Sequence, residues 1–114
     1  MPNTNENLGN VAQEMRRGLI MLAVLSQLAK QQYGYALLKL LGEAGLEVDQ
    51  GTLYPLLRRL ESQGLLQSAW SVEEGRPRRY YVISAEGKKL LPQLKSEWGG
   101  MVAVMGKLLK SGKE

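Results

Sequence analysis

The stretch between residues 51 and 81 most limits the folds open to this sequence. Four leucines recur there at the spacing of one helical face, and Gly64 stands where that helix would end. Two segments rich in aliphatic, β-branched and aromatic residues, 65–72 and 79–83, lie on either side of Gly75, which predicts a β-hairpin with a glycine turn. A helix followed by a hairpin with three arginines between residues 76 and 79 is typical of a winged helix-turn-helix. The leucines are Leu53, Leu56, Leu57 and Leu60.

Two further helices precede this stretch. The run from about Asn10 to Lys30 contains no proline, and its centre, Leu19 to Leu25, is apolar on every side, as expected of a buried central helix. A second helix is predicted from Gly34 to Ala44, with Gly45 placed to end it in a left-handed conformation. The first helix is also compatible with an earlier start, because an apolar repeat extends upstream to Leu8.

The start of the third helix has two candidate capping residues. Asp49 is one, and Thr52 is the other, which would put Pro55 in the first turn, where its missing N–H costs nothing. With either start, the outward face of the helix has little side-chain bulk at Gly51 and Pro55 and carries a positive charge at Arg58.

These elements predict one α+β domain that is mostly helical. The chain has 114 residues, 44% of them hydrophobic, which suits one compact core. We expect a flexible tail over residues 1–9, a winged helix-turn-helix DNA-binding domain over 10–84, and a C-terminal dimerisation helix over 85–110 that is continuous with the same compact unit. The tail from Lys110 is expected to be loose.

Charge and hydropathy favour a cytoplasmic protein with a polyanionic partner. The formal net charge is +4, a modest excess that suits double-stranded DNA without requiring it. The N-terminus lacks the basic start and apolar run of a signal peptide, and the longest apolar run is too short for a bilayer, which needs about 20 residues. We therefore expect no membrane association.

The residue types argue against an enzyme. Histidine and cysteine are both absent, which removes the usual triads, thiol nucleophiles and nitrogen- or sulfur-ligated metal sites. Ser84 near Lys88 is the nearest candidate for a catalytic dyad, but a serine that caps a helix followed by a solvated lysine explains the pair more simply. We expect no catalytic residue, no cofactor and no metal.

The candidate DNA-binding residues lie on the third helix and the hairpin. Small residues on the outward face let the helix backbone approach the major groove, and the hairpin arginines suit phosphates or the minor groove. The alternative is structural: Tyr54 packs under the hairpin, and the helix arginines form ion pairs with Glu61 or Glu43. The candidates are Thr52, Tyr54, Arg58, Arg59, Arg76, Arg78 and Arg79.

A heptad-like apolar seam in the C-terminal helix predicts homodimerisation. Its apolar residues step alternately by three and four, and such a seam needs a partner helix. Pro92 and the pair Gly99-Gly100 weaken the helix, so tertiary or intersubunit packing must support it. The expected dimer residues are Leu8, Ala12, Met15, Leu91, Leu94, Trp98, Met101, Val102, Met105 and Leu108.

Several motifs taken together resemble the PadR family of bacterial transcriptional regulators, over about two thirds of the chain. The resemblance implies a homodimeric winged-helix repressor of a palindromic operator, with the C-terminal helix as the dimer element. It also implies that Thr52, Tyr54 and Arg58 match the family's DNA-contacting positions in the third helix, and that the arginines of the hairpin match its basic wing. Pro77-Arg78 is a departure, whose extra charge would strengthen nonspecific binding. The motifs are residues 33–37, 51–61, 63–66, 75–81 and 84–87.

The chain is similar to the small members of that family with a single C-terminal helix, some of which sense planar apolar drugs. In some of them a tryptophan from each subunit lines a pocket at the dimer interface, and Trp98 stands at the matching place here. Met101 and Met105 offer adaptable walls for such a pocket. The alternative is that Trp98 is a buried anchor of the dimer.

The sequence thus predicts a dimeric DNA-binding repressor, with relief by a planar apolar effector as a further hypothesis. A winged-helix module that binds a partner protein, with little specific DNA binding, is the second hypothesis. A ligand-binding protein with vestigial DNA contacts is the third.

Overall fold

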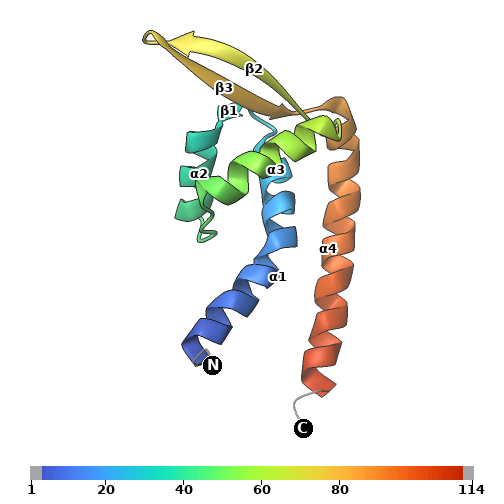
Figure 1. The fold of residues 1–114 in the computed structure, drawn as a ribbon. Helices are drawn as coiled ribbons and strands as arrows, with labels where there is room; N and C mark the ends of the chain where they lie inside the picture. The colour runs from blue at the N-terminus through green and yellow to red at the C-terminus, as the bar shows by residue number, and fades with distance from the viewer. Residues whose placement is uncertain (1–3, 112–114) are drawn as a thin grey trace.

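The computed structural model describes residues 4–111, in which three helices and a β-hairpin gather around the second half of the first helix (Figure 1). Helix α1 (Thr4–Gln27) runs up through the body, and α2 (Gly34–Glu43) and α3 (Gln50–Ser62) pack across its upper half. Helix α4 (Ala85–Ser111) then descends beside α1. This confirms the expected winged helix-turn-helix with a long C-terminal helix.

Helix α1 starts earlier than the expected position near Asn10. Residues 4–9, placed in a loose tail by the sequence analysis, are helical and exposed. The apolar repeat that includes Leu8 is therefore part of the helix, as the earlier start required. Residues 1–3 of the expected N-terminal tail, and residues 112–114 of the expected C-terminal tail, lie outside the described residues.

The helix boundaries follow the predicted stop and start signals. Gly45 and Gly64, with φ angles of 102° and 81°, adopt the left-handed conformation that follows a helix end. Asp49 caps α3, since its carboxylate accepts the N–H of Thr52 at 2.7 Å. The alternative cap at Thr52 was wrong. Pro55 consequently lies inside α3, where it leaves the carbonyl of the exposed Gly51 without its usual helical donor.

The wing is a two-stranded antiparallel hairpin. Strands β2 (Leu66–Glu73) and β3 (Arg76–Ile83) meet at a two-residue turn in which Glu74 and Gly75 both have positive φ, as in a type I′ hairpin turn. Strand β3 begins at Arg76 rather than at the expected Arg79. Pro77 is tolerated there because it lies beyond the reach of the third strand, so that β3 has one neighbour only.

The third strand was not anticipated. Strand β1 (Gln32–Tyr33) pairs antiparallel with Tyr80 and Tyr81 of β3, which gives the sheet order β1-β3-β2. Because β1 immediately precedes α2, the sheet ties the wing to the start of that helix.

The core lies where all these elements meet. Its most buried side chains include Leu25 from the end of α1, Leu28 just after that helix, Leu37 from α2 and Leu57 from α3, each exposed by 1% or less. Ser84 closes the core at the start of α4, where its hydroxyl accepts the N–H of Gly87 at 3.0 Å. The expected capping role of Ser84 is confirmed.

Below the core, the N-terminal part of α1 and the C-terminal part of α4 extend away from the other elements (Figure 1). Residues 4–11 of α1 and 95–110 of α4 are exposed along their whole length. No helix within residues 4–111 is sufficiently long and apolar to cross a membrane.

Candidate nucleic-acid interface

Helix α3 turns a polar and cationic side toward solvent. Its four leucines are buried, at 5% exposure or less, which fixes the orientation of the helix. Thr52, Arg58 and Arg59 are exposed, as predicted, and so is Pro55 between them. The N-terminal end of α3, with its positive dipole, is also exposed from Gln50 to Thr52.

Tyr54 has a different environment from the other candidates on α3. It is half-buried, and its ring lies against Gly34, the first residue of α2. It also lines a hollow between α2, α3 and the wing, to which Arg58, Arg78 and Arg79 contribute. The structure therefore packs Tyr54 against α2 and leaves it partly open to this hollow, which the wing borders.

The three wing arginines do not share one face, because side chains alternate along a strand. Arg76 is exposed near the turn. Arg78 stacks over the ring of Tyr33, with its guanidinium carbon 4.4 Å from the ring centre. Arg79 points to the opposite face and forms an ion pair with Glu61 of α3, at 2.9 Å between Nη2 and Oε1.

Aromatic contacts hold the Arg78 side of the wing against β1. The rings of Tyr33 and Tyr80 meet edge to face, with centres 5.7 Å apart. A hydrogen bond to Glu73 is the largest reason why the pKa of Tyr80 is raised above its ordinary value. Tyr80 therefore holds its phenolic proton more tightly than an ordinary tyrosine does.

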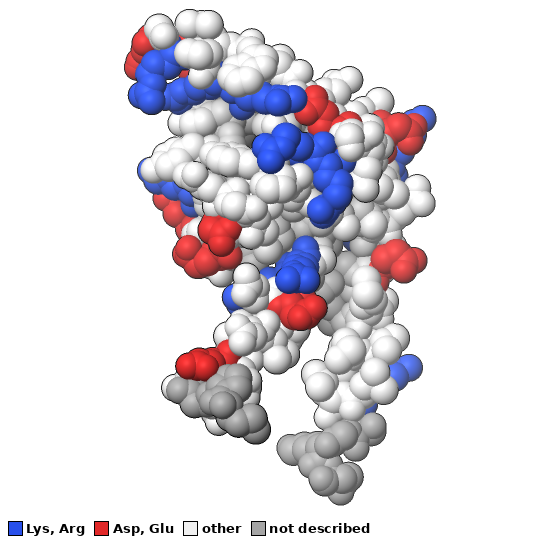
Figure 2. Space-filling view, in the orientation of Figure 1, with Lys and Arg blue, Asp and Glu red and all other residues white. Residues whose placement is uncertain are grey.

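The cationic surface extends beyond the predicted residues. Figure 2 shows Lys and Arg side chains along the wing, on α3 and, further down, on α1. Arg17 of α1 lines a hollow together with Thr52 and Arg59 of α3. Arg17 and its neighbour Arg16 were not predicted to belong to this surface, and the one signal in the sequence is a pair of adjacent arginines ahead of a buried helical segment.

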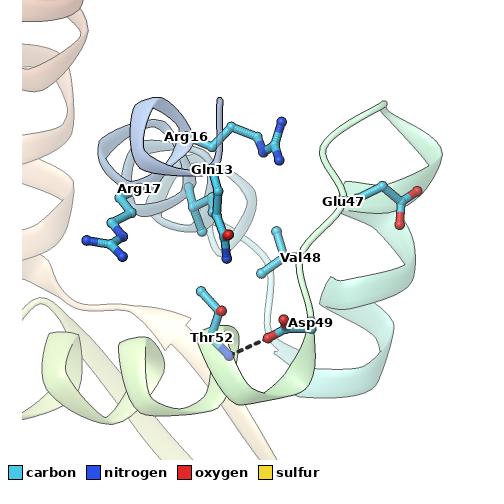
Figure 3. Close-up of a pocket in the computed structure, with 8 residues that line it drawn as sticks. Gln13, Arg16, Arg17, Glu47, Val48, Asp49 and Thr52 are labelled. Atoms are coloured by element: carbon cyan, nitrogen blue, oxygen red, sulfur yellow. Dashed lines mark hydrogen bonds between the residues drawn. The ribbon is translucent and has the colours of Figure 1, made fainter. Parts of the chain in front are cut away.

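A second hollow lies between α1 and the loop that precedes α3 (Figure 3). Gln13, Val48 and Thr52 point toward one another in it, with Arg16 and Arg17 spread to either side. The hydrogen bond from the N–H of Thr52 to the carboxylate of Asp49 lies at the base of this hollow. This side of α3 is therefore polar, and the hollow is lined by two carboxylates, of Glu47 and Asp49, as well as by the two arginines.

The expected dimer residues fall into two groups. Leu91 and Leu94 are half-buried against the core of their own chain. The remaining apolar members on α4 are exposed, and so are Leu8 and Met15 on α1, whereas Ala12 is partly buried. The exposed residues on α4 are Trp98, Met101, Val102, Met105 and Leu108.

The expected ligand residues are brought together in part. Met101 and Met105 line a hollow of about 420 Å³ on α4, together with Val104 and Gly100. Trp98 is not among its lining residues, and its side chain is 43% exposed.

Comparison with known proteins agrees with this geometry. Residues 21–93 match the model of the transcriptional regulator PadR-like family. The chain is 38% identical over 81 residues to Transcriptional regulator Rv3488 of Mycobacterium tuberculosis, a match that covers 70% of this chain and 76% of the relative.

Solved structures show the same architecture. A PadR family transcriptional regulator from Eggerthella lenta DSM 2243 superposes with a TM-score of 0.87 at 43% identity, over 92% of this chain and 94% of that one. A PadR family regulator from hypervirulent Clostridium difficile has a TM-score of 0.72 at 35% identity, over 79% and 97% of the two chains. The family model covers more than half of the chain, and the exposed basic helix and wing are those of a winged helix. The chain therefore belongs to the PadR-like family of DNA-binding transcriptional regulators.

Proposed function

We propose that the protein is a homodimeric repressor that binds a palindromic operator. The two α3 helices, related by the dimer twofold, enter successive major grooves about 34 Å apart. The wings contact the flanking phosphates. The observation that carries this proposal is the exposed row of Thr52, Pro55 and Arg58 on α3, beside a basic wing, in a chain that also leaves a long apolar surface uncovered.

The major-groove mode is supported by the shape and charge of α3. Gly51 and Pro55 present little side-chain bulk on the outward face, so the backbone can approach the base edges. Thr52 and Arg58 then reach bases or phosphates, and Arg59, on the side of α1, meets the DNA backbone. Arg17 of α1 adds a further contact to the DNA phosphates beside Arg59, since the two arginines line one hollow.

The proposed dimer is supported by the exposed apolar residues on α4 and at the start of α1. Met101, Met105 and Leu108 repeat at a coiled-coil spacing and are 56%, 46% and 56% exposed. Monomeric proteins seldom expose so long an apolar surface. Packing of α4 and the start of α1 against the partner subunit covers it and sets the distance between the two recognition helices.

An effector would act by changing the distance between the two recognition helices of the dimer. The hollow lined by Met101, Val104 and Met105 is apolar and adaptable, and it lies on the proposed dimer face. A planar apolar ligand held there shifts the equilibrium away from the operator-bound arrangement to the extent that it binds the other arrangement more tightly.

The experiment that tests the proposal is a titration of the purified protein against the DNA upstream of its own coding sequence. A footprint with twofold symmetry, and an affinity that exceeds nonspecific binding by roughly a thousandfold or more, is the expected result. Weak binding that is equal for every duplex would refute the operator model and favour a winged helix whose partner is a protein.

A further inference from the structure

The Glu61 carboxylate on α3 is tied to both strands of the wing. Arg79 of β3 donates from Nη2 to Oε1 of Glu61 at 2.9 Å. The hydroxyl of Ser68 on β2 donates to Oε2 at 2.6 Å and accepts from Nε of Arg79 at 3.1 Å. The three side chains close a ring of hydrogen bonds that uses both carboxylate oxygens. We call Glu61, Ser68 and Arg79 the α3–wing bridge.

Arg79 contacts aromatic rings of its own chain as well as the other bridge residues. Its guanidinium lies 5.5 Å from the ring centre of Tyr81 and 5.9 Å from that of Trp70. The side chains of Arg79 and Glu61 are only 36% and 29% exposed. Glu61 offsets the positive charge, and two of the guanidinium nitrogens already donate to the bridge. Arg79 therefore attracts a phosphate less strongly than the exposed Arg76.

The α3–wing bridge lies where the hairpin leaves the body. On the same face, Leu66 and Ile83 are buried on the near side of the bridge. Beyond it, Trp70 and Val72 are 67% and 70% exposed. The bridge is thus placed to set the angle of the outer hairpin relative to α3.

We propose that Arg79 is a positioning residue, which holds the wing at a fixed angle to the recognition helix through Glu61 and leaves phosphate contact to Arg76 and Arg78. The inference rests on the proposed DNA-binding mode, in which helix and wing grip one duplex. It reassigns Arg79 from the DNA-contacting set that the sequence suggested.

The two roles of Arg79 predict opposite effects of removing Glu61. If Arg79 contacts phosphate, Glu61→Ala frees a cation and deletes an anion near the duplex, so DNA binding should strengthen. If Arg79 positions the wing, Glu61→Ala should weaken binding, by up to about fivefold per subunit. Glu61→Gln keeps an acceptor for the bridge and should recover part of the loss. Glu43→Ala, which removes an exposed carboxylate from α2, is the charge-matched control.

Hydrogen exchange of the full-length protein tests the bridge without DNA. Glu61→Ala should speed amide exchange in residues 69–80, while the core of α1 and the Glu43→Ala control stay at wild-type rates. Unchanged exchange in the wing, or stronger DNA binding, would overturn the inference. Failure of the wild-type protein to bind any duplex would instead refute the proposed function, and the exchange result would still decide whether the bridge holds the wing.

A second variant keeps the test valid if Glu61→Ala does not fold. Arg79→Lys retains the charge but loses the planar fork that reaches Glu61 and Ser68 together. The positioning role predicts faster wing exchange and weaker DNA binding with an unchanged salt dependence. Wild-type exchange and wild-type affinity in Arg79→Lys would contradict it.

Discussion

The ring of Tyr54 on α3 occupies the space that a Cβ atom on Gly34 of α2 would need. Gly34 is buried, and a Cβ built on it would overlap Cε1 of the tyrosine. The two helices therefore approach each other closely only because position 34 has no side chain. This contact limits how closely α3 and α2 can approach each other at this point.

Gly34→Ala should consequently destabilise the protein. Overpacking a site of this kind costs about 1–3 kcal/mol, and the neighbour that must move is a half-buried ring. Gly42→Ala in the same helix is the control, because its Cβ would meet only the Glu47 carboxylate at 3.5 Å. That change should stabilise the protein by roughly 0.5–1 kcal/mol. Urea denaturation at one fixed protein concentration measures both, and equal effects would contradict the contact.

Ser84→Ala tests the junction between the hairpin and α4. The buried hydroxyl donates to the carbonyl of Gly64 at 2.6 Å and accepts the N–H of Gly87 at 3.0 Å, so its loss leaves two backbone groups unsatisfied. We expect a loss of about 1–3 kcal/mol in the free energy of unfolding. The exposed Ser62, which donates only to a carbonyl of its own helix, is the control, and Ser62→Ala should stay within about 0.5 kcal/mol of wild type. Thermal melts that fail to separate the two variants would contradict the cap.

The helices, the hairpin and their local signals were predictable from the sequence, because each depends on nearby residues. Gly45 and Gly64 as helix ends and Gly75 in the hairpin turn are determined by local backbone chemistry, whereas Asp49 was one of two candidate caps for α3. Strand β1 was missed, since two residues are too short to show an alternating pattern.

The partners of the polar side chains were less predictable. Glu61 was considered as a partner for the helix arginines, but it pairs with Arg79, which lies 18 residues away on the wing. Likewise, Leu91 and Leu94 continue the apolar seam of α4 in sequence, yet they pack on the core of their own chain. Both outcomes depend on how elements are placed relative to one another, which residue spacing along one element does not determine.

The raised pKa of Tyr80, caused first by a hydrogen bond to Glu73, predicts that the wing is sensitive to alkaline pH. This hydrogen bond raises the pKa of Tyr80 above 10.0, so the protonated phenol is the stabilised form. Its contribution is present below the pKa of the unfolded chain and is lost as the pH rises through the higher folded pKa. Glu73→Gln should lower the pKa of Tyr80, as followed by NMR titration of the ring, whereas Glu74→Gln at the turn should not. An identical titration in all three proteins would refute the pairing.

A charge on the exposed apolar face of α4 should disrupt the proposed dimer. Met105→Lys would bury an unpaired ammonium in each subunit. We expect the dimer as a whole to lose at least about 3 kcal/mol, which raises its dissociation constant by roughly a hundredfold or more. Gln93→Lys adds the same charge to an exposed position of α4 and is the control. Sedimentation velocity over a range of protein concentrations measures the constant. A wild-type protein that is monomeric throughout, or a Met105→Lys variant that dimerises normally, would count against this face.

Trp98 offers a direct test of the proposed effector site. The chain has two tryptophans, so Trp70→Phe leaves Trp98 as the only indole. Planar apolar dyes that enter between the α4 helices should quench its fluorescence in a saturable way, and Met101→Ala should weaken this quenching because the methionine lines the adjacent hollow. Trp98→Ala, with Trp70 alone, is the control for quenching elsewhere. Thermodynamic linkage requires that a dye which weakens operator binding be bound less tightly, by the same factor, when operator is present. Quenching that is equal in both single-tryptophan proteins would show that the dyes do not select the dimer face, and the effector hypothesis would fail.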